Sequence, residues 1–134
     1  MEKLFGRLKK CDFFKTKVEY LGFNMGAEGI KPSLSKVRAI LYWPTPSNVT
    51  DVRSFLGLCS FYHRFIRWFS ELAAPMTDLT KKDRAFVWHD EAEKSFNRLK
   101  TAMVTAPVLQ LPDFEREFVV TMDASEVSIG GILQ

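Results

Sequence analysis

The chain has 134 residues, 46% of them hydrophobic and 13% aromatic, which is enough for a packed core and excludes an intrinsically disordered chain. Its apolar runs are too short to span a membrane, and its charged first residues do not fit a signal peptide. The net charge of +3 combines a basic centre with an acidic end: residues 31–70 carry six basic side chains against one acidic, and residues 101–134 carry one against five. A basic centre suits phosphate binding, and an ordinary solvated surface is the alternative.

The first predicted element is a strand over residues 17–25, where Val18 and Tyr20 favour β structure. Residues 11–14 are its expected partner, and a turn follows at residues 26–29, where two glycines tolerate positive φ.

Three helices are predicted next. Ser33 caps the first, whose apolar face comprises Leu34, Val37, Ile40 and Leu41, and Pro44 ends it. Asn48 caps the second, with Asp51 in the first turn and a buried stripe of Val52, Phe55, Leu56 and Cys59. A third, short helix covers residues 70–79, provided that Pro75 falls in its first turn.

The clearest helix covers residues 90–105, where apolar side chains recur at spacings of four, three and four: Ala92, Phe96, Leu99 and Met103. Asp90 and Glu93 are its expected capping pair. Pro107 and Pro112 bracket an extended link. A strand over residues 117–122, a turn near Ser125 and a returning strand over residues 129–134 complete the chain.

This order predicts an α+β fold, in which a helical middle is flanked by pieces of two different sheets. We expect three regions, residues 1–31, 32–84 and 85–134. A lone hairpin is only marginally stable, so we also expect the last region, residues 85–134, to be the incomplete start of a larger domain. Cys11 and Cys59 match no metal spacing and are predicted to be reduced thiols, with a disulfide as the less favoured alternative. His63 and His89 have no matching ligand or nucleophile.

Basic residues in the middle of the chain are the first candidate binding residues. If residues 53–67 formed one helix, Gly57, Arg64 and Arg67 would each lie within about 40° of Arg53 around the helix axis, on one face. Glycine there would let a nucleic-acid backbone approach closely. The interleaved aromatics, Phe61 and Trp68 among them, are more often core residues than stacking platforms for bases.

A dozen short motifs in register resemble the reverse transcriptases of Ty3/gypsy-type LTR retrotransposons, from about residue 8 to the last residue. They are 10–13 (KCDF), 18–22 (VEYLG), 29–30 (GI), 36–40 (KVRAI), 43–46 (WPTP), 53–58 (RSFLGL), 62–66 (YHRFI), 86–88 (FVW), 96–100 (FNRLK), 106–109 (APVL), 112–114 (PDF) and 123–125 (DAS). Three sites depart from the family pattern. Phe23 stands where the family usually has histidine, Ser33-Leu34 where it often has Asp-Pro, and Phe61-Tyr62-His63-Arg64 where it often has Tyr-Tyr-Arg-Arg; His63 weakens one phosphate-binding position.

The resemblance implies the end of a polymerase palm, a helical thumb-like middle, and a connection that opens an RNase H-like domain. It implies that Tyr20, Leu21, Gly22 and Phe23 form a primer-grip-like hairpin, although the residues alone indicate only a strand ending in glycine. By the resemblance, Asp123 matches the first catalytic, metal-binding carboxylate of ribonuclease H. The alternative interpretation, from the residues alone, is an Asp that starts a turn with Ser125.

The implied cofactor is Mg²⁺ in the intact enzyme. The implied partners are primer–template or RNA–DNA hybrid and the remainder of the Pol polyprotein, with no membrane. The implied location is intracellular, either in a cytoplasmic virus-like particle or in the nucleus. One acid cannot hold two metal ions, so the chain alone is expected to lack a complete active site. The alternatives are a non-catalytic remnant or domesticated fragment that serves as an interaction module, and a gene-model artefact.

Overall fold

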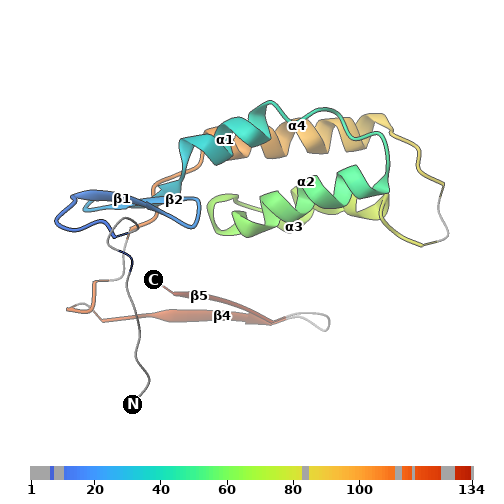
Figure 1. Ribbon diagram of the computed structural model, residues 1–134. Helices are drawn as coiled ribbons and strands as arrows, with labels where there is room; N and C mark the ends of the chain where they lie inside the picture. The colour runs from blue at the N-terminus through green and yellow to red at the C-terminus, as the bar shows by residue number, and fades with distance from the viewer. Residues whose placement is uncertain are drawn as a thin grey trace, which may run out of the picture.

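A three-stranded antiparallel sheet opens the fold in the computed structural model, which describes residues 7, 11–82, 85–110, 113–115, 117–124 and 129–133. Strands β1 (Lys17–Tyr20), β2 (Phe23–Gly26) and β3 (Gly29–Pro32) pair in the order β1-β2-β3. Together with the helices and the hairpin that follow, they confirm the α+β class (Figure 1).

The single strand predicted over residues 17–25 is wrong, because the chain reverses in its middle. Leu21 and Gly22 both have positive φ, 49° and 80°, so that Tyr20 pairs with Phe23 across a two-residue turn. Residues 11–14 form no strand; β3 is the other neighbour of β2, and the expected turn at residues 26–29 joins β2 to β3.

In the described part of the chain, four α-helices follow the sheet: α1 (Leu34–Leu41), α2 (Val49–Phe61), α3 (Phe69–Asp78) and α4 (Asp90–Val104). One 3-10 turn, His63–Phe65, separates α2 from α3. In Figure 1, α1 and α4 lie in one layer and α2 and α3 in a second layer below it. Helix α4 packs against both α1 and α3, and α3 packs against α2, so the two layers enclose one core.

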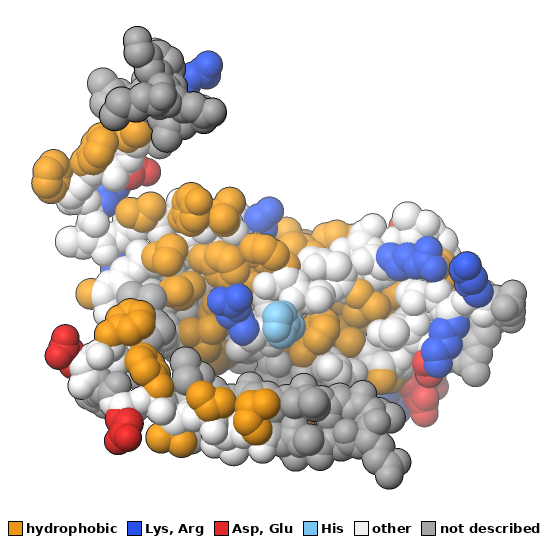
Figure 2. Space-filling view, turned by 90° about the horizontal axis from the view of Figure 1, so that it is seen from below, with side chains coloured by type: hydrophobic (Ala, Val, Ile, Leu, Met, Phe, Trp, Pro, Cys, Tyr) orange, Lys and Arg blue, Asp and Glu red, His pale blue; other side chains and the backbone are white. Residues whose placement is uncertain are grey.

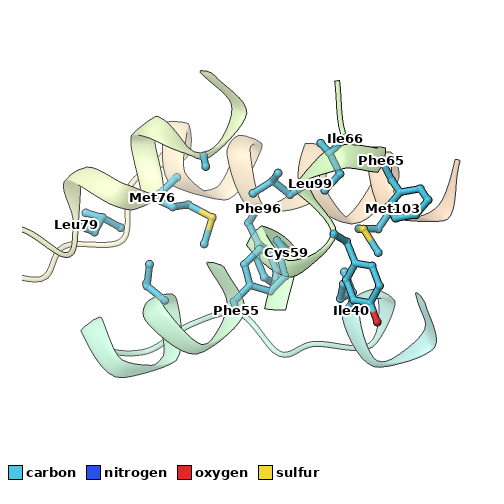
Figure 3. Close-up of a cluster of buried hydrophobic side chains, with 14 residues drawn as sticks. Ile40, Phe55, Cys59, Phe65, Ile66, Met76, Leu79, Phe96, Leu99 and Met103 are labelled. Carbon is cyan, nitrogen blue, oxygen red and sulfur yellow. The ribbon is translucent and has the colours of Figure 1, made fainter. Parts of the chain in front are cut away.

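The core confirms the stripes predicted for the two longest helices. Ala92, Phe96, Leu99 and Met103 of α4 are all buried, as are Val52, Phe55 and Cys59 of α2. The rings of Phe55 and Phe96 meet with centroids 4.6 Å apart between the layers (Figure 3). The face predicted for α1 is largely wrong, because this short helix buries Ile40 and leaves Leu34 67% exposed.

The helix ends match the predictions in part. Asn48 Oδ1 accepts a hydrogen bond from the Asp51 N–H at 2.9 Å, which confirms the cap of α2. The cap of α4 is His89 and not Asp90, since His89 Nδ1 accepts from the Ala92 N–H. Glu93 instead binds the Trp88 indole N–H at 2.7 Å. Pro75 lies inside α3 and not in its first turn; because proline has no N–H, it cannot donate the helical bond to the carbonyl of residue 71, an exposed residue.

The extended link after α4 returns to the first sheet. Ile30 and Leu109 exchange two backbone hydrogen bonds, of 2.7 and 2.8 Å, so that Leu109 adds to the free edge of β3. Gly29, with φ of 122°, allows this approach, because a Cβ there would overlap the Leu109 carbonyl oxygen.

Strands β4 (Val120–Ala124) and β5 (Ile129–Leu133) form the predicted second hairpin, which lies below the helices in Figure 1. The predictions that concern Pro112, Ser125 and Gln134 fall outside the described residues. Both cysteines are free thiols, and burial raises the pKa of Cys59 to about 12. Within the described ranges, no helix is both long and apolar enough to cross a bilayer.

Candidate nucleic-acid interface

The hairpin turn, residues 20–23, presents two of its side chains to solvent. Tyr20 is 61% and Leu21 69% exposed, whereas Gly22 and Phe23 are half-buried. Phe23 points toward the helices, where its ring centroid lies 5.2 Å from that of Phe61 at the end of α2. The four residues singled out in the sequence therefore divide into an outward pair and an inward pair.

A stripe of three exposed residues runs along α2: Arg53, Gly57 and Phe61. Each is four positions from the next, so successive members are offset by about 40° around the helix. The Arg53 guanidinium donates to the Thr80 carbonyl at 3.0 Å, which fixes it at one end of the stripe. Phe61, 51% exposed, stands at the other end.

Gly57, in the middle of this α2 stripe, faces open space. A Cβ built on it would have no atom within 4 Å. Nothing among the described residues therefore requires a glycine here for packing, and the helix surface at this point is bare backbone.

Residues 53–67 do not form one helix, so the condition for a face shared by Arg53, Gly57, Arg64 and Arg67 is not met. Helix α2 ends at Phe61, and Arg64 falls in the 3-10 turn that follows. Arg67 comes after an extended residue and before Trp68, which has φ of 58°. Both arginines are exposed, but only Arg53 and Gly57 remain on a common helix.

Two aromatic residues that the sequence favours as core are exposed. Phe61 is 51% and Trp68 64% accessible, and the Arg67 guanidinium lies 5.9 Å from the Trp68 ring centroid. In the view of Figure 2, hydrophobic side chains gather on the surface beside basic ones. The exposure of Phe61 could have been predicted from its spacing of four from Gly57 on the same helix. The exposure of Trp68 could not, because the position of Trp68 depends on where α2 ends.

Lys100 shows how a basic residue can serve the fold alone. Its ammonium donates to the Trp43 carbonyl at 2.5 Å and lies 4.1 Å from the Phe96 ring centroid. Burial lowers the pKa of Lys100. It therefore ties α4 to the connector between α1 and α2 and is not a candidate for phosphate binding.

Asp123 lies in β4, with Gly130 opposite it in β5. Among the residues that the structure describes, no three His, Cys, Asp or Glu side chains are grouped to hold a metal ion. Those residues therefore do not by themselves fit the two-metal site that the sequence resemblance implies.

Comparison with known proteins identifies what this arrangement resembles. Residues 88–134 match the model of an RNase H-like domain found in reverse transcriptase. The retrovirus-related Pol polyprotein from transposon gypsy of Drosophila melanogaster is 39% identical over 93% of the chain, which spans 13% of that polyprotein. An uncharacterised mitochondrial protein of Arabidopsis thaliana is 37% identical over 87% of the chain and 75% of its own length.

Among solved structures, the foamy viral protease-reverse transcriptase in complex with RNA/DNA hybrid superposes with a TM-score of 0.76 at 27% identity. The match covers 88% of this chain and 16% of the viral one. The chain thus spans about a tenth of the transposon polyproteins and a sixth of the viral protein that it matches.

Proposed function

The chain belongs to the Ty3/gypsy-type reverse transcriptase–ribonuclease H family of retrotransposon Pol proteins, and we propose that it binds the primer–template of such an enzyme. The ligand is an RNA–DNA hybrid or a DNA duplex, held along the α2 stripe. The related foamy viral protein, solved with an RNA/DNA hybrid, supports this choice of ligand.

The observation that carries the proposal is the bare surface at Gly57. Glycine inside a helix costs about 1 kcal/mol relative to alanine, and no neighbour within 4 Å requires it. Since no described residue explains the glycine, we infer that it serves the bound nucleic acid, because the absence of a side chain permits close approach. Arg53 on one side supplies a cation for phosphate, and Phe61 on the other supplies an apolar face for sugar or base.

The hairpin turn provides the second contact of the proposed interface. Its exposed members, Tyr20 and Leu21, offer apolar and backbone groups to the primer strand, and Phe23 of the same turn packs on Phe61 at the end of the α2 stripe. Arg64 and Arg67 lie just beyond α2 and add exposed positive charge, which strengthens attraction to phosphates without reading sequence.

Salt dependence tests this electrostatic part. Affinity for an RNA–DNA hybrid should fall steeply as salt rises, and Arg53→Ala should reduce the slope of log K against log salt by about 1. Fluorescence anisotropy with a labelled hybrid measures both. Lys94→Ala, an exposed cation on α4, is the matched control and should leave the slope unchanged. Absence of hybrid binding even at low ionic strength would overturn the proposed function.

For Asp123 we propose a role as one ligand of a divalent ion, Mg²⁺ by family, completed by carboxylates outside the described residues. Because the described residues supply no three-ligand group, the chain itself should bind Mg²⁺ only weakly, with a Kd in the millimolar range or above. Isothermal titration of the wild type and Asp123→Asn checks this. A micromolar site that Asp123→Asn removes would show that the chain holds a complete metal centre.

A further inference from the structure

Tyr62 lies where the hairpin turn meets the end of α2, and it is completely buried. Its hydroxyl donates to the Gly22 carbonyl oxygen at 3.0 Å. The same oxygen accepts the backbone N–H of Ser33 at 2.8 Å, so two donors from different parts of the chain hold one carbonyl of the turn. Burial, and then the charge of Glu19, raise the pKa of Tyr62, so the phenol keeps the proton that it donates.

The ring of Tyr62 belongs to an aromatic cluster that joins the turn to the helix. The Phe23 ring packs edge-on against it, with centroids 5.2 Å apart, and stacks on Phe61 at the same distance. Phe65, in the 3-10 turn, closes the cluster at 5.9 Å from Phe23. The inward half of the turn is thus packed against the residue that ends the α2 stripe.

The turn has little room to move within this packing. Gly22 has φ of 80°, a conformation that side chains disfavour, and a Cβ on it would lie 2.6 Å from the Tyr62 hydroxyl oxygen. Leu21, beside it, also has positive φ although it is not a glycine. Surrounding contacts must hold such a residue in place, and Tyr62 and the aromatic cluster contact the two residues that follow it, Gly22 and Phe23.

We propose that Tyr62 is a positioning residue of the nucleic-acid interface, which fixes the hairpin turn relative to the α2 stripe so that both contact the same duplex at once. This inference rests on the proposed function. Tyr62 is buried and touches no ligand itself. Its effect is preorganisation. Because the hairpin turn and the α2 stripe are already held in one geometry in the free chain, they lose less conformational entropy when the duplex binds.

The test compares Tyr62→Phe, which keeps the ring and removes the hydroxyl, with Ser95→Ala. Ser95 is the matched control because its buried hydroxyl also donates to a backbone carbonyl, that of Leu72, in the α3–α4 interface. Amide hydrogen exchange in the free chain and hybrid affinity are measured for both variants. Tyr62→Phe should speed exchange at Ser33 and residues 21–24 by about fivefold and weaken binding by a similar factor. Ser95→Ala should change neither.

A double mutant separates positioning from general destabilisation. Leu21→Ala removes an exposed contact of the turn, and it should weaken binding less in the Tyr62→Phe background than in the wild type. If Tyr62→Phe does not fold, Phe23→Leu, which keeps the hydroxyl bond and loosens the cluster, takes its place.

Unchanged turn exchange, unchanged affinity, or strictly additive effects in the double mutant would each overturn the role of Tyr62. Failure of the wild-type chain to bind the hybrid is a different result, and it contradicts the proposed function instead. In that case faster turn exchange in Tyr62→Phe would still show the mechanical link, but not its use in binding, so the positioning role would fall as well.

Discussion

Replacing Phe55 by alanine is expected to lower the free energy of unfolding of the helical layers by about 3–5 kcal/mol. Phe55 is completely buried, with its ring centroid 4.6 Å from that of Phe96 and 5.8 Å from that of Trp43. It therefore joins α2, α4 and the connector after α1, and its removal leaves a cavity that three separate segments line.

Urea unfolding followed by the helical circular dichroism signal measures this change, because that signal reports α1 to α4 and not the separate β4–β5 hairpin. Phe114→Ala is the matched control: the same side chain is lost, but Phe114 is 84% exposed, and a change below about 0.5 kcal/mol is expected. A loss of less than about 1 kcal/mol in Phe55→Ala would mean that the two layers do not share the core described here.

Gly57→Leu is expected to have opposite effects on stability and on binding. Leucine favours a helix over glycine by nearly 1 kcal/mol, and the space around the site is open, so the chain should become slightly more stable. The same side chain would stand between the helix and the duplex. Affinity for the hybrid should fall about thirtyfold, as when a central interface residue is lost.

Ala39→Leu is the matched control for this variant, since it adds a leucine to an exposed position of α1, away from the α2 stripe. It should leave hybrid affinity within about twofold of the wild type. Gly57→Ala should fall between wild type and Gly57→Leu in affinity. If Gly57→Leu binds as tightly as the wild type, the nucleic acid does not approach α2 at this point, and the glycine has no explanation in the structure.

Local patterns predicted the parts of the fold that local interactions decide. The spacing of Ala92, Phe96, Leu99 and Met103 identified the buried side of α4, and Asn48 identified the start of α2 from a single side chain–backbone bond. Other features depend on distant contacts. The run from Tyr20 to Phe23 is compatible with a continuous strand, and the reversal within it is held by distant residues, through the packing of Phe23 against the helices and the Tyr62 bond to Gly22.

The candidate site was predicted incompletely for the same reason. Arg53 and Gly57 share a face because they lie one turn apart on one helix. Arg64 does not share this face, because α2 ends at Phe61. The next residue, Tyr62, points inward and binds Gly22, 40 positions earlier in the chain. The spacing of apolar residues along a helix cannot predict a hydrogen bond between residues so far apart in the sequence. The sequence favours a core position for Phe61 because aromatics at this spacing are more often buried, whereas in the structure its ring stacks on Phe23 and half of the side chain is exposed.

The backbone pairing of Ile30 with Leu109 bears on the order in which the chain can fold. These two residues are far apart in sequence, so joining them directly in an unfolded chain would carry a large loop-closure entropy. Helices α1 to α4 shorten that loop by packing on one another, and they bring its two ends together. We therefore expect this strand pairing to form late, after the helices have assembled. The sheet edge would then be the last part of residues 17–110 to gain protection, and the first to lose it.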